Sequence, residues 1–202
     1  MESTSIKPLA EDTRQQILQA AESRFGQYGY NKTTMAEIAE DTGMSAANIY
    51  RYFDNKEDIA AACTSRWMCM RIDRLRNAIR QPGLTAVQRL QDYVLTTLRV
   101  SHEMALENSK IYELCETITN NRQDLIYEKI DAEIALLAEV LANGNDTGEF
   151  NINDIIATAS TVHSALVIFD VPIFMGLFPY EQFEERARAI VKLLVTGLEN
   201  KP

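Results

Sequence analysis

The chain has 202 residues, a formal net charge of −9 at neutral pH, and 46% hydrophobic residues, with only 8 glycines and 5 prolines. A chain of this length can bury a substantial core, and its composition favours a helical globular protein over a disordered one. The negative charge argues against a protein that binds nucleic acid through its overall charge, because neutralising phosphates requires clustered lysine and arginine. Even residues 1–58 carry six basic against ten acidic side chains. Any contact with DNA must therefore depend on the local placement of charge.

Neither a metal site nor a membrane span is expected. The longest apolar run, residues 165–178, is interrupted by Asp170 and Pro172 and is too short to cross a bilayer. An odd number of cysteines, without a cationic and apolar leader, favours a soluble protein of the reducing cytoplasm, with a redox switch as the alternative. The cysteines lack the CxxC or Cys/His spacing of a zinc site and stand at Cys63, Cys69 and Cys115.

In chain order, residues 1–10 show no apolar period and predict a mobile arm. The first helix is expected over residues 12–28, where an apolar stripe would cover the two helices that follow. Gly29 ends this helix. The stripe consists of Ile17, Ala20, Ala21, Phe25 and Tyr28.

Residues 34–53 predict two short helices joined by a tight turn. Thr33 or Thr34 can cap the first of them, which runs to about residue 42. Gly43 follows where the chain must leave a helix sharply, and glycine reaches the left-handed conformation without a Cβ penalty. Ser45 can cap a second helix that runs from Ala46 towards Phe53. Helix, tight turn and helix form the geometry with which many proteins read DNA.

The second of these helices has one face for packing and one for contact. Ile49 and Phe53 share the packing face, because they are four residues apart. Small side chains let the helix approach a groove floor, while the donors of Asn48 and Arg51 suit base edges. The alternative is a helical hairpin inside an ordinary all-α core. The residues expected to meet DNA are Thr34, Ser45, Ala46, Ala47, Asn48, Tyr50, Arg51, Tyr52 and Lys56.

This segment resembles the DNA-binding signature of the TetR (tetracycline repressor) family of bacterial transcription regulators. The matching positions are Thr33-Thr34, Ile38-Ala39, Gly43-Met44-Ser45, Ile49-Tyr50, Tyr52-Phe53 and Asn55-Lys56-Glu57, with Thr13-Arg14, Ile17-Leu18, Ala20-Ala21, Phe25 and Gly29-Tyr30 upstream. The resemblance covers about the first third of the chain. It implies phosphate contacts at Thr34, Tyr50, Tyr52 and Lys56, and base contacts at Ser45 to Asn48 and at Arg51. Ala47 and Asn48 replace residue types that are frequent in the family, so the operator sequence does not carry over.

Asn55 is expected to cap a long fourth helix that ends near Arg80, before the Gln81-Pro82-Gly83 stop. This helix links the predicted DNA-binding domain to the rest of the chain. Its arginines are expected to form a solvated face. They are Arg66, Arg71, Arg74, Arg76 and Arg80.

Three further helices are expected over residues 85–108, 109–119 and 121–143, the last closing at Asn143-Gly144. Their amphipathic side chains, together with some from the helix that begins at residue 152, suit a cavity for an apolar or aromatic molecule with one polar group. Ordinary core packing is the competing interpretation for each residue taken singly. The candidate effector residues are Tyr93, His102, Met104, Tyr112, Cys115, His163 and Phe169.

The last two helices are expected over residues 152–168, with a kink or break at Pro172, and over residues 180–199. The first of them is apolar on more than one side and so needs two partners. Both partners can lie within the chain, or one can be a second copy in a two-fold interface, as the resemblance implies. The candidate dimerisation residues are Ile155, Ala159, Leu166, Phe183, Ala187, Ile190, Leu194 and Leu198.

The sequence therefore predicts an all-α protein with an arm (residues 1–10), an N-terminal three-helix DNA-binding domain with a helix-turn-helix (residues 11–58) and a C-terminal helical domain for effector binding and dimerisation (residues 59–202). We expect a cytoplasmic, homodimeric repressor that binds a double-stranded DNA operator and a small apolar or aromatic effector, without cofactor, metal or membrane contact. The alternative is a helical ligand-binding or interaction protein without regulatory DNA binding. An enzyme ranks third, because His102 and His163 fall in no catalytic motif.

Overall fold

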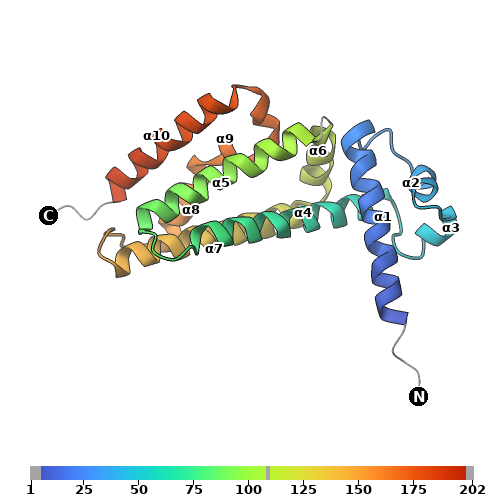
Figure 1. The fold of residues 1–202 in the computed structure, drawn as a ribbon, viewed down its shortest axis with the longest axis horizontal. Coiled ribbons are helices and arrows are strands. Elements are labelled where there is room, and N and C mark those ends of the chain that lie inside the picture. The colour runs from blue at the N-terminus through green and yellow to red at the C-terminus, as the bar shows by residue number, and fades with distance from the viewer. Residues whose placement is uncertain (1–5, 108–109, 199–202) are drawn as a thin grey trace, which may run out of the picture. The chain divides into compact units, whose positions relative to one another are not determined.

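A computed structural model of the chain describes residues 6–107 and 110–198. These ranges consist of helices and loops without a β-sheet (Figure 1), which confirms the all-α prediction. The α-helices and the 3-10 helix η1 are α1 (Ile6–Tyr28), α2 (Met35–Asp41), α3 (Ala46–Ile49), α4 (Lys56–Ile79), α5 (Ala86–Glu107), α6 (Ile111–Asn121), α7 (Gln123–Asp146), α8 (Ile155–Ala165), α9 (Val167–Asp170), η1 (Pro172–Gly176) and α10 (Tyr180–Leu198). No helix in the described ranges is both long enough and apolar enough to span a bilayer.

The chain divides into two compact units. The first comprises Met1–Trp67 and Glu107–Leu125, and the second comprises Met68–Leu106 and Ile126–Pro202. The helix α4 begins in the first unit and ends in the second, so it joins them covalently. The helix α6, which the sequence analysis assigned to the C-terminal domain, belongs to the first unit, where it packs against α1.

Local capping interactions position the short helices of the first unit. The Thr34 hydroxyl accepts a hydrogen bond from the Glu37 N–H, and the Glu37 carboxylate accepts one from the Thr34 N–H at 2.8 Å, which forms a capping box at the start of α2. Gly43 has φ +65°, and Ser45 caps α3 by accepting a hydrogen bond from the Asn48 N–H. The predicted helix starts and the glycine turn are confirmed.

The first helix begins earlier than predicted. Residues 6–10 are helical and not part of an arm, whereas residues 1–5 lie outside the described residues. Pro8 does not prevent this start, because it falls in the first turn, where an N–H has no partner within the helix. Tyr28 is exposed, so it lies off the predicted stripe. The buried members of that stripe are Ile17, Ala21 and Phe25.

The core of the second unit is built around α5. Its buried residues Leu90, Val94 and Leu98 recur at four-residue spacing and therefore lie on one face. They belong to one apolar cluster with residues from the end of α4, from α7 to α10 and from η1. The helix α7 runs beside the second half of α4 (Figure 1), where Arg80 and Glu139 pair at 2.8 Å.

The end of α7 corrects the predicted helix boundary. The helix continues through Gly144 to Asp146, and the chain turns at Gly148, which has φ +75°. Gly144 is buried because the ring of Phe150 packs directly on its Cα, in the space that a Cβ would occupy. This glycine therefore permits a close approach and does not end the helix.

The penultimate helix is interrupted twice. The helix α8 starts after Asp154, whose carboxylate caps it by accepting the Ala157 N–H at 2.9 Å. It ends at Leu166, and the four-residue α9 is followed by η1 with Pro172 as its first residue. The predicted break at Pro172 is confirmed, and the break at Leu166 is an additional one.

The apolar stripe of α10 covers the core of its own chain, and the dimer interface itself stays a prediction. Four of the proposed interface residues are buried within the chain and are not available to a second copy: Ala159, Leu166, Phe183 and Ala187. The other four are partly buried against the same core: Ile155, Ile190, Leu194 and Leu198. The exposed apolar side chains of α8 and α10 are different ones, Ile156 at 63% and Leu193 at 70% exposure.

Replacing Gly144 by alanine is expected to destabilise the protein by about 1–3 kcal/mol, because the new methyl group would overlap the Phe150 ring. Chemical denaturation of the purified variant measures this loss. In a Phe150→Leu background the smaller side chain should reduce the additional loss. An equal loss in both backgrounds would show that the Phe150 contact is not its cause.

Candidate DNA-binding and effector sites

The predicted recognition segment forms a short helix followed by tighter turns. The regular helix α3 covers Ala46–Ile49, and the chain reaches Phe53 through bonds such as that from the Arg51 N–H to the Asn48 carbonyl, at 3.1 Å. Ile49 and Phe53 are buried and hold the segment against the unit, as predicted. The exposed residues are Ser45, Ala46, Ala47, Tyr50 and Arg51, and the half-buried ones are Asn48 and Tyr52.

Lys56 is engaged within the first unit. Its ammonium donates a hydrogen bond to the Tyr30 carbonyl at 2.7 Å and lies 4.2 Å from the centroid of the Tyr30 ring. Burial lowers the pKa of Lys56, although the carboxylates of Glu113 and Glu37 oppose this shift. Lys56 therefore ties the turn after α1 to the start of α4. Its contact with a phosphate stays a prediction.

The helix α6 supports the same turn. The Glu113 carboxylate accepts a hydrogen bond from the Asn31 N–H at 3.1 Å. Near the other end of α6, the Asn121 amide donates to Glu57 at the start of α4, at 3.2 Å. The residues of α6 thus help to position the turn after α1 and the start of α4, which flank α2 and α3 in the chain.

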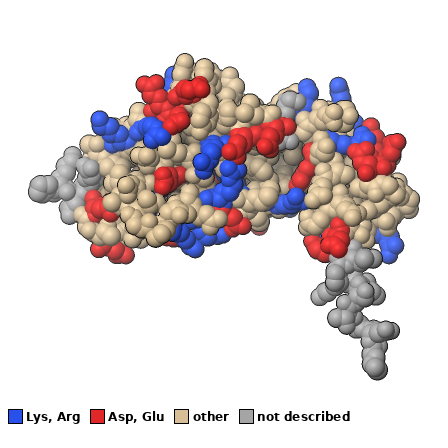
Figure 2. Space-filling model, in the orientation of Figure 1, with Lys and Arg blue, Asp and Glu red and all other residues tan. Residues whose placement is uncertain are grey.

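Part of the negative charge of α2 is balanced locally. Arg24 donates two hydrogen bonds to Asp41, at 2.5 and 2.8 Å, and lies 3.3 Å from Glu37. The hydrogen bond from Arg24 lowers the pKa of Asp41, and the bond from Thr34 lowers that of Glu37. On the face shown in Figure 2, basic and acidic side chains lie next to each other, and neither sign forms a continuous area. A net negative charge is compatible with DNA binding if only a few exposed donors make the contact.

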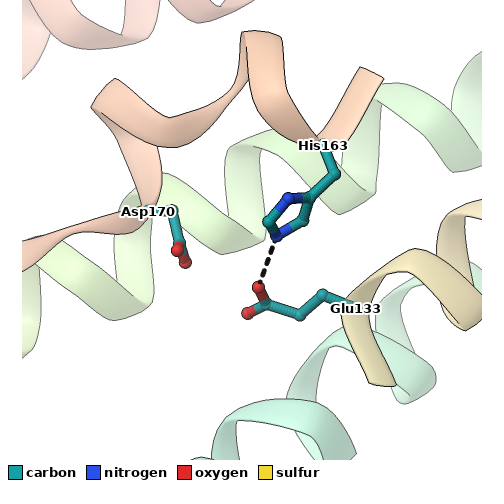
Figure 3. Close-up of side chains that lie close together, drawn as sticks. All are labelled: Glu133, His163 and Asp170. Carbon is teal, nitrogen blue, oxygen red and sulfur yellow. Dashed lines mark hydrogen bonds and ion pairs between the residues drawn. The ribbon is translucent and has the colours of Figure 1, made fainter. Parts of the chain in front are cut away.

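The second unit contains a buried ionic cluster. We use the name "ionic cluster" for Arg71 of α4, Lys129 and Glu133 of α7, His163 of α8 and Asp170 of α9. Figure 3 shows Glu133, His163 and Asp170 pointing toward one another from their three helices. Arg71 and Glu133 have almost no exposed side-chain surface, at 0% and 1%. The solvated face predicted for the arginines of α4 is therefore wrong for Arg71.

The charges of the ionic cluster form a closed ring. Arg71 donates to Glu133 Oε1 at 2.7 Å and to Asp170 Oδ1. Lys129 donates to Glu133 Oε2 at 2.9 Å and to Asp170 Oδ2 at 2.5 Å. His163 Nε2 lies 3.0 Å from Glu133 Oε2. Two cations thus share two carboxylates, which makes burial of the group tolerable.

The protonation of the ionic cluster follows from these contacts. Burial alone would raise the pKa of Glu133, but the hydrogen bond from His163 and the charges of Arg71 and Lys129 outweigh it and hold that pKa well below its usual value. Burial would lower the pKa of Arg71, but the carboxylates of Asp170 and Glu133 raise it. Both groups are therefore charged at neutral pH.

Two hydroxyl groups of α5 extend the ionic cluster, and a third lies between them. Ser101 accepts a hydrogen bond from Arg71 at 3.0 Å and donates to the Asp170 carbonyl at 2.6 Å. The Tyr93 hydroxyl donates to the Glu133 carbonyl at 3.4 Å. Thr97 lies between them on the same helix face, and its buried hydroxyl has no hydrogen-bond partner within the described ranges.

The donor atoms of Glu133, His163 and Asp170 lie within 4.8 Å of one another, a spacing that suits a metal ion. Both carboxylates, however, already accept hydrogen bonds from Arg71 and Lys129. The Lys129 ammonium supplies the positive charge that a metal ion would otherwise bring. The set fits a protein cation better than a metal.

The structure groups three of the predicted effector residues. Tyr93, His163 and Phe169 lie at or next to the ionic cluster, Phe169 being buried beside Asp170. His102 packs against Tyr180 with 4.7 Å between ring centroids and 56° between the ring planes. The remaining three are half-buried Met104 on α5, and exposed Tyr112 and half-buried Cys115 on α6, which belongs to the other unit.

The sequence analysis missed Arg71, Lys129 and Glu133 as members of one site. The available signals were the i, i+4 pair of Lys129 and Glu133 and the single charge of Asp170 within an apolar run. Neither signal identifies Arg71, which is 62 residues from Glu133 in sequence.

A separate depression of about 250 Å³ lies at the end of the second unit. It contains none of the predicted effector residues. Its lining residues are Ile79, Arg80, Arg89, Glu139, Val140 and Asn143.

A capped helix-turn-helix in one unit and a helical domain with a buried polar site in the other define a DNA-binding transcriptional regulator with a separate C-terminal domain. The family profile described as "Bacterial regulatory proteins, tetR family" matches residues 17–63, and the profile described as "Tetracyclin repressor-like, C-terminal domain" matches residues 86–191. The chain therefore belongs to the TetR family of bacterial transcriptional regulators.

Known proteins resemble the chain over nearly its full length. The "Fatty acid metabolism regulator protein" of Bacillus subtilis is 25% identical over 189 residues, which cover 92% of this chain and 95% of that protein. A putative TetR-family transcriptional regulator from Rhodococcus sp. has a similar fold, with a TM-score of 0.72, 20% identity, and coverage of 91% of this chain and 99% of the other. The fatty acid degradation regulator FadR from Bacillus halodurans has a TM-score of 0.65, 19% identity, and coverage of 90% and 94%. The two structural similarities concern the fold alone.

The Glu133→Gln variant tests the ionic cluster. Because the pKa of Glu133 is lower in the folded than in the unfolded chain, its contribution to stability is present above about pH 5 and is lost as pH falls through the range below about 4.3. The free energy of unfolding of the variant should be lower by about 3–5 kcal/mol at pH 7, and it should depend less on pH in the acid range.

Urea denaturation between pH 3 and pH 7 measures both effects. Glu128→Gln, at an exposed position on the same helix, controls for the loss of any carboxylate and should cost much less. A Glu133→Gln protein with unchanged stability at pH 7 would contradict the role of this carboxylate.

Proposed function

We propose that the protein is a homodimeric repressor that binds an operator through α2 and α3 of each copy and is released by a small molecule bound in the second unit. The observation that carries the DNA-binding role is a row of exposed side chains on a capped helix-turn-helix: Ser45, Ala46, Ala47, Tyr50 and Arg51. Ala46 and Ala47 have small side chains, so the helix backbone can approach DNA closely. Arg51 supplies hydrogen-bond donors at the end of the row. Such a row can enter a major groove and read base edges. Because a bacterial repressor acts on operator DNA, we expect this protein in the cytoplasm.

The release mechanism follows from linkage between two binding equilibria. An operator with two half-sites fixes the separation of two DNA-binding units in a dimer. An effector that binds more tightly to a form with a different separation must lower operator affinity by its preference for that form. The helices α4 and α7 both begin in the first unit and end in the second, so each can support this coupling.

The names of two similar proteins guide the choice of regulated genes. One is a regulator of fatty acid metabolism, and the other a regulator of fatty acid degradation. We therefore propose that the operator controls genes for the metabolism of fatty acids or related apolar acids. The effector is then an apolar molecule with one polar group, for which the core of the second unit supplies the apolar surroundings.

Selection from a random duplex library tests operator binding. The purified protein should enrich a sequence with two related half-sites, and its affinity should fall steeply as salt rises, because phosphate contacts release counterions. Failure to enrich any sequence over a salt range from 50 to 200 mM would contradict the proposed function.

The Ala47→Glu variant tests the placement of the recognition segment. A carboxylate at this exposed position would face phosphates and base acceptors, so binding to the selected duplex should weaken by at least about tenfold. Gln19→Glu adds the same charge at an exposed position of α1 and should have little effect. Electrophoretic mobility shifts compare the variants, and circular dichroism establishes that both are folded.

The dimer interface is proposed on the outer surfaces of α8 and α10, where Ile156 and Leu193 are exposed apolar side chains. Leu193→Glu should give a folded monomer with weakened operator binding, because a charge buried in the interface would lack a partner. Leu194→Glu instead disturbs the core of its own chain and should lower the melting temperature. Analytical ultracentrifugation distinguishes the two. A fully dimeric Leu193→Glu protein would place the interface elsewhere.

A further inference from the structure

We propose that the Asp170 carboxylate occupies, in the free protein, the position that a carboxylate group of the effector takes when it binds Arg71 and Lys129. The inference names the chemical class of the ligand and the residues that bind its polar group. It rests on the proposed function only in treating this ligand as the effector that releases DNA. The binding of the ligand itself can be measured without DNA.

The first support is the arrangement of donors around Asp170. One of its oxygens accepts a hydrogen bond from Arg71, and the other accepts from Lys129 at 2.5 Å. Two cations on different helices therefore hold one carboxylate between them. A ligand carboxylate in the same position would gain the same two charge-assisted hydrogen bonds. The site is thus already formed around a group with the chemistry of the ligand.

The second support is that Asp170 is the replaceable partner in the ionic cluster. Glu133 lies in the middle of the long helix α7 and is 1% exposed. Asp170 ends the four-residue α9, between the break at Leu166 and Pro172. Its backbone carbonyl is held by the Ser101 hydroxyl at 2.6 Å, so the side chain can rotate outward without movement of the backbone.

The third support is an entry path. The side chains of Asp170, Lys129 and His163 are 10%, 11% and 12% exposed, whereas Arg71 is fully buried. These three residues therefore form the less buried edge of the ionic cluster. A ligand that displaces Asp170 toward solvent can reach Arg71 along this edge.

The fourth support is the unpartnered hydroxyl of Thr97. It is buried on the face of α5 that carries Tyr93 and Ser101 one turn away on either side, and both of these bond to residues of the ionic cluster. A buried hydroxyl without a partner is unfavourable. A ligand carboxylate beside Arg71 would give it an acceptor.

The chemistry of the surroundings defines the ligand class. Replacing Asp170 by one ligand carboxylate leaves two cations with two carboxylates, so the buried charge stays balanced. A phosphate monoester would add negative charge, and an amide would leave one cation without an anion. Buried apolar residues lie within about one helical turn of members of the ionic cluster, among them Leu137, Leu166 and Phe169. We therefore infer a monocarboxylic acid with an apolar body.

Isothermal titration calorimetry with decanoate, decanamide and decyl phosphate tests this inference on the full chain. Wild type should bind decanoate at least about tenfold more tightly than either of the others. Asp170→Asn removes the competing carboxylate and should bind decanoate about tenfold more tightly than wild type. Asp131→Asn, at an exposed position on α7, is the matched control and should bind as wild type does.

Two further variants test the carboxylate site if the Asp170→Asn protein does not fold. Lys129→Gln should weaken decanoate binding about tenfold and leave decanamide binding unchanged. Thr97→Val keeps the shape of the side chain and should fold at least as stably, yet bind decanoate several-fold more weakly. A merely structural hydroxyl would not change the ratio between decanoate and decanamide.

Several results would overturn the inference: equal binding of decanoate and decanamide, tighter binding of decyl phosphate, or an Asp170→Asn protein that folds and gains no affinity. Decanoate binding as described, without selection of any operator, would support the site and contradict the proposed function. Operator binding without decanoate binding would contradict the inference alone.

Discussion

An arginine with no exposed side-chain surface governs the second unit. Removing a guanidinium from water is unfavourable by several kcal/mol unless carboxylates accompany it, and Arg71 pairs with the carboxylates of Glu133 and Asp170. These partners come from α7 and α9, while Ser101 contributes from α5. One buried charge thus connects four helices, and an arrangement that moved Glu133 and Asp170 away would leave it without these carboxylates. An apolar core alone does not select a single arrangement so strictly.

The first unit follows a different logic, because neighbouring residues determine most of its geometry. The capping box of Thr34 and Glu37, the left-handed Gly43 and the cap at Ser45 are all contacts within a few residues. Longer-range contacts then support these local elements: Lys56 and Glu113 both hold the turn after α1. The pairing of Arg24 with Asp41 also limits the negative charge near the recognition segment, which explains how an acidic protein can present a DNA-binding surface.

The outer helices illustrate how one pattern can serve two purposes. An apolar stripe such as Phe183, Ala187 and Leu194 indicates that one face of the helix is buried. It does not indicate whether that face packs against its own chain or against a second copy. In the structure the stripe covers the core of its own chain, and the exposed apolar residues Ile156 and Leu193 lie outside it. Residues of a dimer interface must be exposed in the single chain. An apolar period therefore identifies the helix face that packs on the core more readily than the face that meets a second copy.

The sequence by itself determined the helical class, the family resemblance, the position of the helix-turn-helix and the breaks at Gly43 and Pro172. Each of these depends on backbone conformation or on spacing within a few residues, and such signals can be read along the chain. Only the tertiary structure decided that Arg71 is buried, that Gly144 lies under the Phe150 ring and that Tyr93 and His163 share a site. Arg71 and Asp170 are 99 residues apart. An arginine on a helix has the same local sequence pattern whether water or a distant carboxylate surrounds it, so only the packing of helices distinguishes the two.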